Sequence, residues 1–352
     1  MTTSRWPWRR ARRVLAAAVT AAASLSPVAA CGPTSPGPTS PGPPSAAPAP
    51  ASPVPRPAVT RLYADPANSL FAAAAHLAGR DPAEAAGLRA IARTPSSFWA
   101  AGQPGEMQMV RQVTRAAARH HSVPVIVAYN LPHRDACGKF SAGQETGAAG
   151  YRHWIGRLAA AIGGGDDIVI VEPDGLLDIL RPCLSASQDS QRYQLLRDAM
   201  KVLGALPHAR VYLDAGNPGL FRDPSVLTEP LRKAGIQYGR GFSANVANFQ
   251  WTGTVIAWSQ RLEGDLASTA RAVIDTSRNG RGPYTGHDYP RWCNPPGRAL
   301  GPVPRLDPGP AGIDAYLWIK NPGASDGPCH GGPPAGQDWP QYAAALASAS
   351  QR

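Results

Sequence analysis

The sequence predicts an α/β fold, a closed or nearly closed TIM-like barrel of parallel strands that alternate with helices. Short apolar runs recur along the chain, each ending on a polar residue, at residues 123–130, 167–174, 209–217, 241–249, 271–279 and 314–321. Amphipathic, helix-like stretches separate several of them, such as residues 150–162 and 191–206. Apolar runs of this length between amphipathic helices indicate parallel strands that are covered on both faces. With residues 61–66 as a candidate first member, seven such units favour a barrel over an open sheet.

The N-terminal segment has the pattern of an export signal. Residues 1–30 begin with an arginine-rich stretch, continue with an apolar run that starts at Val14, and end in small residues. The run is too short for a membrane span. The sequence VAAC at residues 28–31 favours a lipoprotein signal, in which Cys31 is lipidated and becomes the mature N-terminus. Ordinary cleavage after Ala30 is the alternative. The first interpretation places the protein on the outer face of the cell membrane, and the second makes it a secreted protein.

A proline-rich linker follows the signal. Eleven of the 27 residues from 31 to 57 are proline, and the motif GPTSP occurs twice. Such a segment has little to bury and forms an extended spacer. Residues 58–352 are long enough for one large hydrophobic core, so we expect a single folded domain, monomeric and separated from a surface by the linker.

The net charge gives no sign of a nucleic-acid partner. The chain carries a formal charge of +11, which falls to +6 without the five arginines of residues 1–30. The remaining charges are dispersed, and no stretch resembles a basic nucleic-acid-binding arm. We therefore expect no nucleic acid among its partners, and contact with a membrane only through the lipid anchor.

The four cysteines of the domain favour disulfides. They are Cys137, Cys183, Cys293 and Cys329. An even number of cysteines in an exported domain predicts two disulfides, with three pairings open. Metal ligation is the rival interpretation, but no two of these cysteines have the short spacing of a zinc site, so we expect no metal.

Polar side chains gather at the ends of the predicted strands. They are Tyr129, Asp135, Glu172, Asp174, Asp214, Asn245, Asp275, Lys320 and Asp326. Because the carboxyl ends of barrel strands form the active face, this ring predicts a catalytic site. Asp174, in the stretch VIVEPDGLLDIL, has an alternative role as a helix cap, since aspartate accepts hydrogen bonds from free N–H groups at a helix start. Five strand ends that carry aspartate favour catalysis over capping.

Seven motifs occur in a fixed order along the domain. They are YNLPHRDACGKFSAG, VIVEPDGLLD, YLDAGNPGL, FSANVANF, DTSRNGRGP, WCNPPGRALG and DAYLWIKNPGASDGPC. Together they resemble glycoside hydrolase family 6, whose members are cellulases that act on β-1,4-glucan. The resemblance extends from about Arg61 to the C-terminus. It implies a distorted seven-stranded parallel β/α barrel and an inverting hydrolase that uses no metal or cofactor.

The resemblance assigns the chemistry to carboxyl groups on either side of the scissile bond, which lie roughly 6.5–9.5 Å apart in inverting enzymes. Asp174 corresponds to the general acid, which needs a raised pKa to keep its proton near neutral pH. Asp135 corresponds to the carboxylate that raises that pKa and stabilises positive charge at the anomeric carbon. Tyr129 corresponds to the tyrosine beneath the distorted sugar, and Ser141 to the serine that helps to hold the attacking water. Asp326 is the candidate base, acting through a chain of water molecules.

The resemblance also implies a set of substrate contacts. The residues in this set are Trp99, Trp292, Trp251, Lys320, Asn245 and Asp214. The indoles would stack on the flat faces of sugar rings, with Trp251 on the leaving-group side. Asp214 has an alternative role, in which it orients its neighbours. The resemblance further pairs Cys137 with Cys183 and Cys293 with Cys329.

Two positions depart from the family pattern. Ala324 stands where the family usually has a sugar-binding glutamate, and Asn217 stands where it has a histidine. The short segment after Asp326 favours an open groove and internal cleavage, so we expect an endo-β-1,4-glucanase. A cellobiohydrolase is the alternative, since the loops over the cleft decide between internal and end-directed cleavage. The departures leave open a hydrolase of another β-linked glycan and, in another class, a surface glycan-binding lipoprotein without catalysis.

Overall fold

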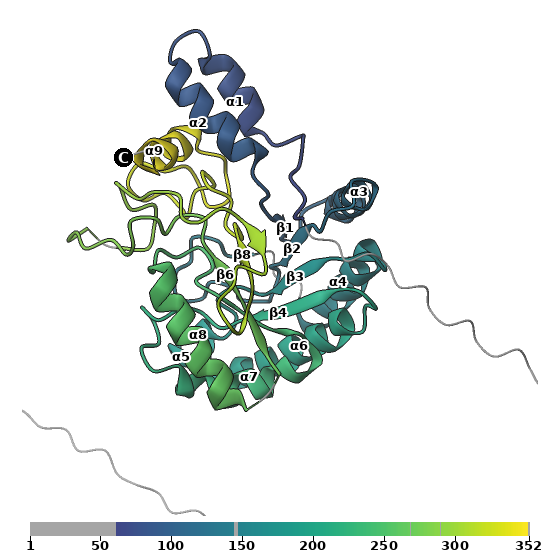
Figure 1. Ribbon diagram of the computed structural model, residues 1–352. Coiled ribbons are helices and arrows are strands. Elements are labelled where there is room, and N and C mark those ends of the chain that lie inside the picture. The colour runs from purple at the N-terminus through teal and green to yellow at the C-terminus, as the bar shows by residue number, and fades with distance from the viewer. Residues whose placement is uncertain (1–60, 144–146, 268, 289, 351–352) are drawn as a thin grey trace, which may run out of the picture. The chain divides into compact units, whose positions relative to one another are not determined.

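The structure, a computed structural model, describes residues 61–143, 147–267, 269–288 and 290–350 (Figure 1). The expected signal, the lipidation site Cys31 and the linker lie outside the described residues. Within the described ranges, no helix combines the length and the apolar character that a membrane span needs.

In the described part of the chain, eight strands, seven of them parallel, form a single curled sheet (Figure 1). The strands of the sheet are β1 (Phe98–Ala100), β2 (Val125–Ala128), β3 (Ile168–Val171), β4 (Arg210–Asp214), β5 (Gly241–Ala244), β6 (Arg271–Asp275), β7 (Arg305–Leu306) and β8 (Ile313–Leu317). Their spatial order is β1-β2-β3-β4-β5-β6-β8-β7, and only the two-residue β7 runs antiparallel to its neighbour. The predicted α/β barrel of seven parallel strands is thus confirmed, with one short antiparallel strand added at the edge.

The sheet curls until its first and seventh parallel strands approach each other. The backbone N–H of Ser97, just before β1, donates to the carbonyl of Trp318 over 3.2 Å. The indole of Trp99 donates to the carbonyl of Ile319 over 2.8 Å. A few bonds rather than a ladder therefore join β1 to the end of β8, which makes the barrel distorted.

The prediction that residues 61–66 form the first strand is wrong. Leu62 makes one isolated parallel bridge, to Val123, and a turn begins at Pro66. The apolar run in this segment is only Leu62, Tyr63 and Ala64, too short for a strand that is buried on both faces. The first strand is instead β1, a three-residue segment too short to show a periodic pattern.

The helices lie along the outside of the sheet and at one end of it (Figure 1). They are α1 (Leu70–Leu77), α2 (Pro82–Arg93), α3 (Glu106–Arg119), α4 (Gly147–Ile162), α5 (Leu177–Leu180), α6 (Ala186–Gly204), α7 (Thr228–Ala234), α8 (Thr252–Leu266) and α9 (Pro340–Ser350), with 3₁₀ turns at Pro224–Leu227 and Ile236–Tyr238. Helix α6 begins with a capping box, in which Ser185 and Gln188 satisfy each other's backbone N–H groups. Helices α1, α2 and α9 enclose a separate small apolar core.

Side chains on each strand alternate between two apolar cores. In β2, Val125 and Val127 belong to the core inside the barrel, whereas Ile126 and Ala128 pack in the core beneath the outer helices. Both sets are buried, so the strand reads as a continuous apolar run rather than an alternating one. Because each strand is buried on both faces, its end is held rigidly, and the polar residues that follow it are held in fixed positions.

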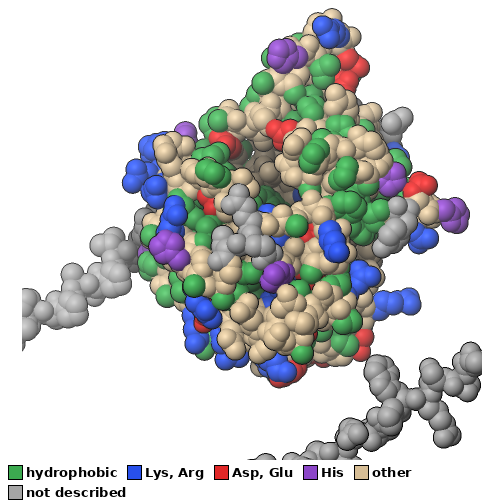
Figure 2. Space-filling view, turned by 180° about the vertical axis from the view of Figure 1, so that it is seen from behind, with side chains coloured by type: hydrophobic (Ala, Val, Ile, Leu, Met, Phe, Trp, Pro, Cys, Tyr) green, Lys and Arg blue, Asp and Glu red, His purple; other side chains and the backbone are tan. Residues whose placement is uncertain are grey.

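On the face seen in Figure 2, charged side chains do not gather in one patch. In the view of Figure 2, Lys and Arg side chains are spread around the molecule, with Asp and Glu between them. This distribution agrees with the dispersed charge expected from the sequence.

Candidate active site

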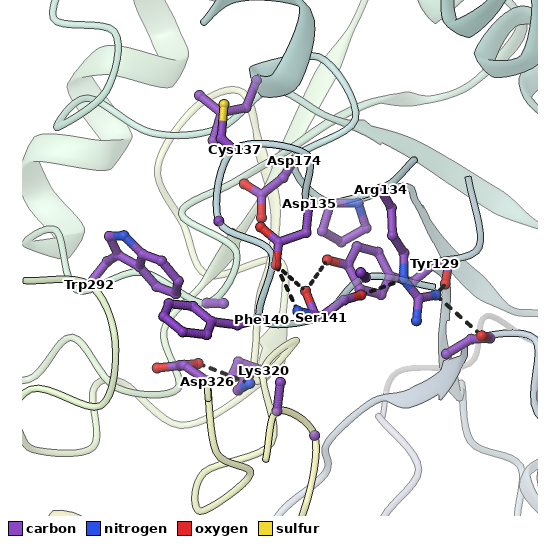
Figure 3. Close-up of a pocket in the computed structure, with 18 of the residues that line it drawn as sticks. Tyr129, Arg134, Asp135, Cys137, Phe140, Ser141, Asp174, Trp292, Lys320 and Asp326 are labelled. Carbon is purple, nitrogen blue, oxygen red and sulfur yellow. Dashed lines mark hydrogen bonds and ion pairs between the residues drawn. The ribbon is translucent and has the colours of Figure 1, made fainter. Parts of the chain in front are cut away.

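A cleft of about 970 Å³ opens at the carboxyl ends of the strands. Eight of the predicted site residues line it: Trp99, Tyr129, Asp135, Ser141, Asp174, Trp292, Lys320 and Asp326. They come from β1 and from the segments that follow β2, β3, β6 and β8. In the view of Figure 3, Asp174 and Asp135 lie on one side of the pocket and Asp326 and Lys320 on the other.

Asp174 is surrounded by protein and remains partly accessible from the cleft. Burial raises its pKa well above the usual range, and the negative charges of Asp214 and three further aspartates add to the effect. A carboxyl group in this setting keeps its proton near neutral pH, as a proton donor must. The helix-cap role is not supported, because α5 has Leu176 at its N-cap and no side-chain cap hydrogen bond.

Asp135 lies at the start of a short polar chain. Its Oδ2 accepts hydrogen bonds from the backbone N–H and the hydroxyl of Ser141, over 2.7 and 3.0 Å. The Ser141 hydroxyl lies 2.9 Å from that of Tyr129, and either group can donate. A Cβ on Gly138 would come within 2.2 Å of Asp135 Oδ1, so a larger residue there would displace this carboxylate. The three side chains form one connected wall of the cleft.

Asp326 is buried and paired with two cations. Its Oδ2 lies 2.8 Å from Arg278 Nη1, its Oδ1 lies 3.0 Å from Lys320 Nζ, and the backbone N–H of Asn294 donates to Oδ2. Burial alone would raise the pKa of Asp326, but the charges of Arg278 and Lys320 outweigh burial and lower it. A carboxylate with a lowered pKa is a weak base. The geometry suits an anchor for Lys320 better than a proton acceptor.

The arrangement agrees with the comparison with known proteins. The family model described as glycosyl hydrolases family 6 matches residues 58–350. The chain belongs to this family. It is therefore a glycoside hydrolase, and the resemblance expected from the seven motifs is confirmed.

Individual members of the family align over most of the chain. Endoglucanase 1 of Streptomyces sp. (strain KSM-9) is 39% identical over 262 residues, which cover 73% of this chain and 70% of that protein. Endoglucanase 1 of Streptomyces halstedii is 36% identical over 292 residues, 80% of this chain and 86% of that one. The solved endoglucanase Cel6 of Mycobacterium tuberculosis superimposes with a TM-score of 0.76 at 38% identity, covering 83% of this chain and 98% of that structure.

Aromatic side chains line the cleft of this family 6 domain on two sides. Trp99 contacts the ring of Tyr129 edge-on, with 5.2 Å between ring centroids. Trp292 is 36% exposed, and its ring centroid lies 5.6 Å from that of Phe140 (Figure 3). Indoles that are fixed at one edge and open on a face can stack on sugar rings. Trp99 and Trp292 have this geometry.

Three predicted substrate contacts do not line the cleft. Asp214 is buried beneath it, where it accepts hydrogen bonds from the backbone N–H of Asp174 and the hydroxyl of Ser243. Asn245 is buried as well, and its amide donates to the carbonyl of Asp275. Trp251 is exposed, outside the set of residues that line the cleft. The structure thus gives Asp214 the alternative, orienting position.

The two departures from the family pattern occupy different environments. Ala324 lines the cleft, two residues before Asp326. Asn217 is buried, and its Oδ1 accepts hydrogen bonds from the backbone N–H groups of Gly219 and Leu220. Asn217 therefore shapes the turn after β4, whereas Ala324 changes the surface that a substrate meets.

Both disulfides join loops beside the cleft. Cys137 is bonded to Cys183, which ties the Asp135 loop to the segment after α5. Cys293 is bonded to Cys329, which ties the loop after β6 to the loop after β8. These are the pairings that the resemblance implies. On loop entropy each contributes roughly 3–4 kcal/mol to stability.

Sequence reasoning missed residues that support the predicted ones. Arg278 anchors Asp326, and the guanidinium of Arg134 lies 4.5 Å from the ring centroid of Tyr129 while donating to the carbonyl of Ser141. Phe140 lines the cleft beside Trp292. Both arginines stand inside motifs already quoted, Arg134 in HRDAC and Arg278 in DTSRNGRGP, but nothing in the motifs shows which side chain each one contacts. No pattern in the sequence pointed to Phe140.

Proposed function

We propose that the chain hydrolyses internal β-1,4-glucosidic bonds of a cellulose-like glucan with inversion at the anomeric carbon. The observation that carries the proposal is the position of Asp174, a carboxyl group with a raised pKa that is accessible from a cleft lined by indoles. Its family relatives include endoglucanases at 36–39% identity.

Asp174 is the proton donor in this mechanism. Its proton goes to the glycosidic oxygen as the bond from that oxygen to the anomeric carbon breaks, and the leaving sugar departs with a free hydroxyl. A water molecule attacks the anomeric carbon from the opposite face, which inverts its configuration. Asp174 then regains a proton from solvent.

The Asp135 side of the cleft serves the developing positive charge. The Asp135 carboxylate stabilises the oxocarbenium-like centre electrostatically. Ser141, which donates to Asp135, is placed to hold the attacking water, and Tyr129 lies beside it. The proton that the attacking water loses passes to solvent through a chain of water molecules on this side of the cleft. Asp326 is the less suitable acceptor, because two cations lower its pKa.

Lys320 and the two indoles position the glucan. Lys320 Nζ is fixed by Asp326 and by the carbonyl of Ser325, at 3.0 and 3.1 Å. It lines the cleft and offers a donor to sugar hydroxyls. Trp99 and Trp292 supply the stacking surfaces on either side. The compact segment after Asp326 supports internal rather than end-directed cleavage.

Export is part of the same proposal. Residues 1–30 act as a signal, Cys31 carries a lipid, and residues 31–57 separate the catalytic domain 58–352 from the membrane. Two disulfides support an oxidising compartment outside the cytoplasm. Labelling with a radioactive fatty acid tests the anchor, and a Cys31→Ala variant that keeps the label would refute it.

Proton NMR of the first products tests the reaction. The full chain, made with both disulfides formed, is mixed with a soluble cello-oligosaccharide. Early appearance of the α-anomer is the expected result. The β-anomer would contradict inversion, and binding without cleavage would favour a non-catalytic glycan-binding protein, with Ala324 the first residue to change.

A further inference from the structure

A buried ion pair lies beside the active cleft and belongs to none of the roles above. Arg192, on α6, places Nη1 2.7 Å from Oδ2 of Asp178, on α5. The two side chains are only 3% and 2% exposed. Asp178 follows Asp174 by one helical turn in the stretch VIVEPDGLLDIL. A buried charge pair is costly unless hydrogen bonds satisfy its remaining groups.

The remaining groups of the pair bind the loop that carries Asp135, on both sides of that residue. Before it, Arg192 Nη2 donates to the carbonyls of Pro132 and His133, over 2.9 and 2.8 Å. After it, the backbone N–H groups of Ala136 and Cys137 donate to the Asp178 carboxylate, over 3.2 and 3.3 Å.

The same pair also reaches the segment that carries the proton donor. Arg192 Nη1 contacts the carbonyl of Gly175, the residue after Asp174, over 3.4 Å. The backbone N–H of Asp178 donates to the carbonyl of Asp174 over 3.3 Å. One ion pair thus connects the backbones next to both active-site carboxyl groups.

Both carboxyl groups stand on backbone that needs such support. Asp135 has φ 54° and Asp174 has φ 64°, in the left-handed region that non-glycine residues rarely adopt. A conformation of this kind persists only where the surrounding structure fixes it. The hydrogen bonds of Asp178 and Arg192 supply that fixation in the segments of both carboxyl groups.

We propose that Asp178 and Arg192 are positioning residues, which set the placement of Asp135 relative to Asp174 in the reaction proposed above. The expected change in kcat rests on the proposed function. The expected loosening of the Asp135 loop does not. Asp178 lines the cleft but is 1% exposed, and the residues proposed to bind sugar, Trp99, Trp292 and Lys320, lie on other segments.

The pair also contributes to the charge around the proton donor. The groups that face Asp174 are Asp214 after β4, Asp178 on α5, Asp135 and Tyr129 after β2, and Asp326 after β8. Asp178 acts in the same direction as burial and Asp214, raising the pKa of Asp174. Removal of the Asp178 charge therefore moves the alkaline limb of the kcat/KM profile to lower pH.

Two variants of the full chain test the inference. Arg192→Lys keeps the charge but cannot span the carboxylate and two carbonyls at once. Asp178→Asn removes the charge and leaves an acceptor. We expect kcat on a cello-oligosaccharide to fall about 10- to 100-fold in each, with KM changed less than threefold, as for a misplaced catalytic group. The alkaline limb should shift in Asp178→Asn and stay near the wild-type position in Arg192→Lys.

Asp314→Asn is the matched control. Asp314 is also a buried partner of arginines, at 2.8 Å from Arg240 and 3.0 Å from Arg271, but it lies at the start of β8, at the opposite end of the strands from the cleft. This variant should lower thermal stability and leave kcat and the pH profile of the folded protein unchanged.

Hydrogen exchange supplies a readout that is independent of activity. The amides of Ala136 and Cys137 should exchange faster in both variants and not in the Asp314→Asn control. Lower thermal stability with unchanged exchange, kcat and pH profile would overturn the inference, as would failure of both variants to fold, which would assign the pair to folding alone. An inactive wild type would refute the proposed function, and the exchange data would still decide the role of the pair.

Discussion

The backbone N–H of Asp174 donates to Oδ2 of Asp214 over 3.1 Å. Asp214 is buried, and burial raises its pKa to about 6. Above that pH its negative charge is the largest electrostatic contribution, after burial, to the raised pKa of Asp174. Asp214, which does not line the cleft, therefore helps to keep the proton on Asp174, which does.

Replacement of Asp214 by asparagine removes this charge and keeps an acceptor for the N–H of Asp174. The pKa of Asp174 should fall, so the alkaline limb of the kcat/KM profile should move to lower pH. A Ser243→Ala variant serves as the comparison, because it removes one hydrogen bond to Asp214 but keeps the carboxyl group, so it should move the limb less than Asp214→Asn does. A limb that moves to higher pH in Asp214→Asn would be incompatible with the assigned role of this charge.

Asp167 should limit stability at neutral and alkaline pH. It is 1% exposed, Oδ2 has no hydrogen-bond partner within the described chain, and burial with the nearby Asp166 charge raises its pKa to about 7. Since the unfolded pKa is about 3.9, the native state binds the proton more tightly, and stability is lost as pH rises between these values.

Asp167→Asn should therefore raise the free energy of unfolding by about 1–3 kcal/mol at pH 8 and by much less at pH 4. Urea denaturation at the two pH values measures the difference. Asp198→Asn, on the exposed face of α6, is the control and should show no such pH dependence. An equal effect of Asp167→Asn at both pH values would show that its charge is not the cause.

Trp99 and Trp292 should bind sugar rather than promote bond cleavage. Each alanine variant should raise KM for a long cello-oligosaccharide by roughly 5- to 30-fold, which corresponds to about 1–2 kcal/mol of stacking energy. The value of kcat should change less. Tyr238, an exposed aromatic on the 3₁₀ turn Ile236–Tyr238, is the control. Unchanged KM in both tryptophan variants would remove the indoles from the substrate path.

Ala324 should weaken substrate binding next to Lys320. In Ala324→Glu, a carboxylate enters the cleft lining near a lysine that is already fixed by Asp326. We expect KM to fall about fivefold, the range of one favourable charged contact. Ala335→Glu adds the same charge elsewhere on the lining and should not lower KM. Equal effects of the two substitutions would indicate a general charge effect.

The strands and their active ends were predictable because each strand is buried on both faces. Residues 123–130 and 167–174 show this as continuous apolar runs, and the polar residues after them lie at the cleft. Three-residue β1 was not predictable, since its pairing depends on the curl of the whole sheet.

The supporting charges were not predictable for a different reason. Arg192 and Asp178 are 14 residues apart on separate helices, and Arg278 meets Asp326, 48 residues further on, only because β6 and β8 pair in the sheet. Such pairs follow from the tertiary arrangement, which leaves no periodic trace in the sequence. The resemblance supplied the reacting residues, whereas the residues that position them came from the structure.

The activity of Asp174→Ala on two substrates tests whether Asp174 is the proton donor. In a cello-oligosaccharide the leaving oxygen must be protonated as the bond breaks. In β-cellobiosyl fluoride the leaving group is a fluoride ion, which departs without help from a strong acid. The variant should lose about 10²- to 10⁴-fold in kcat/KM on the oligosaccharide. It should lose far less on the fluoride and bind the oligosaccharide as the wild type does. Equal losses on both substrates in a folded variant would contradict a role of Asp174 as proton donor.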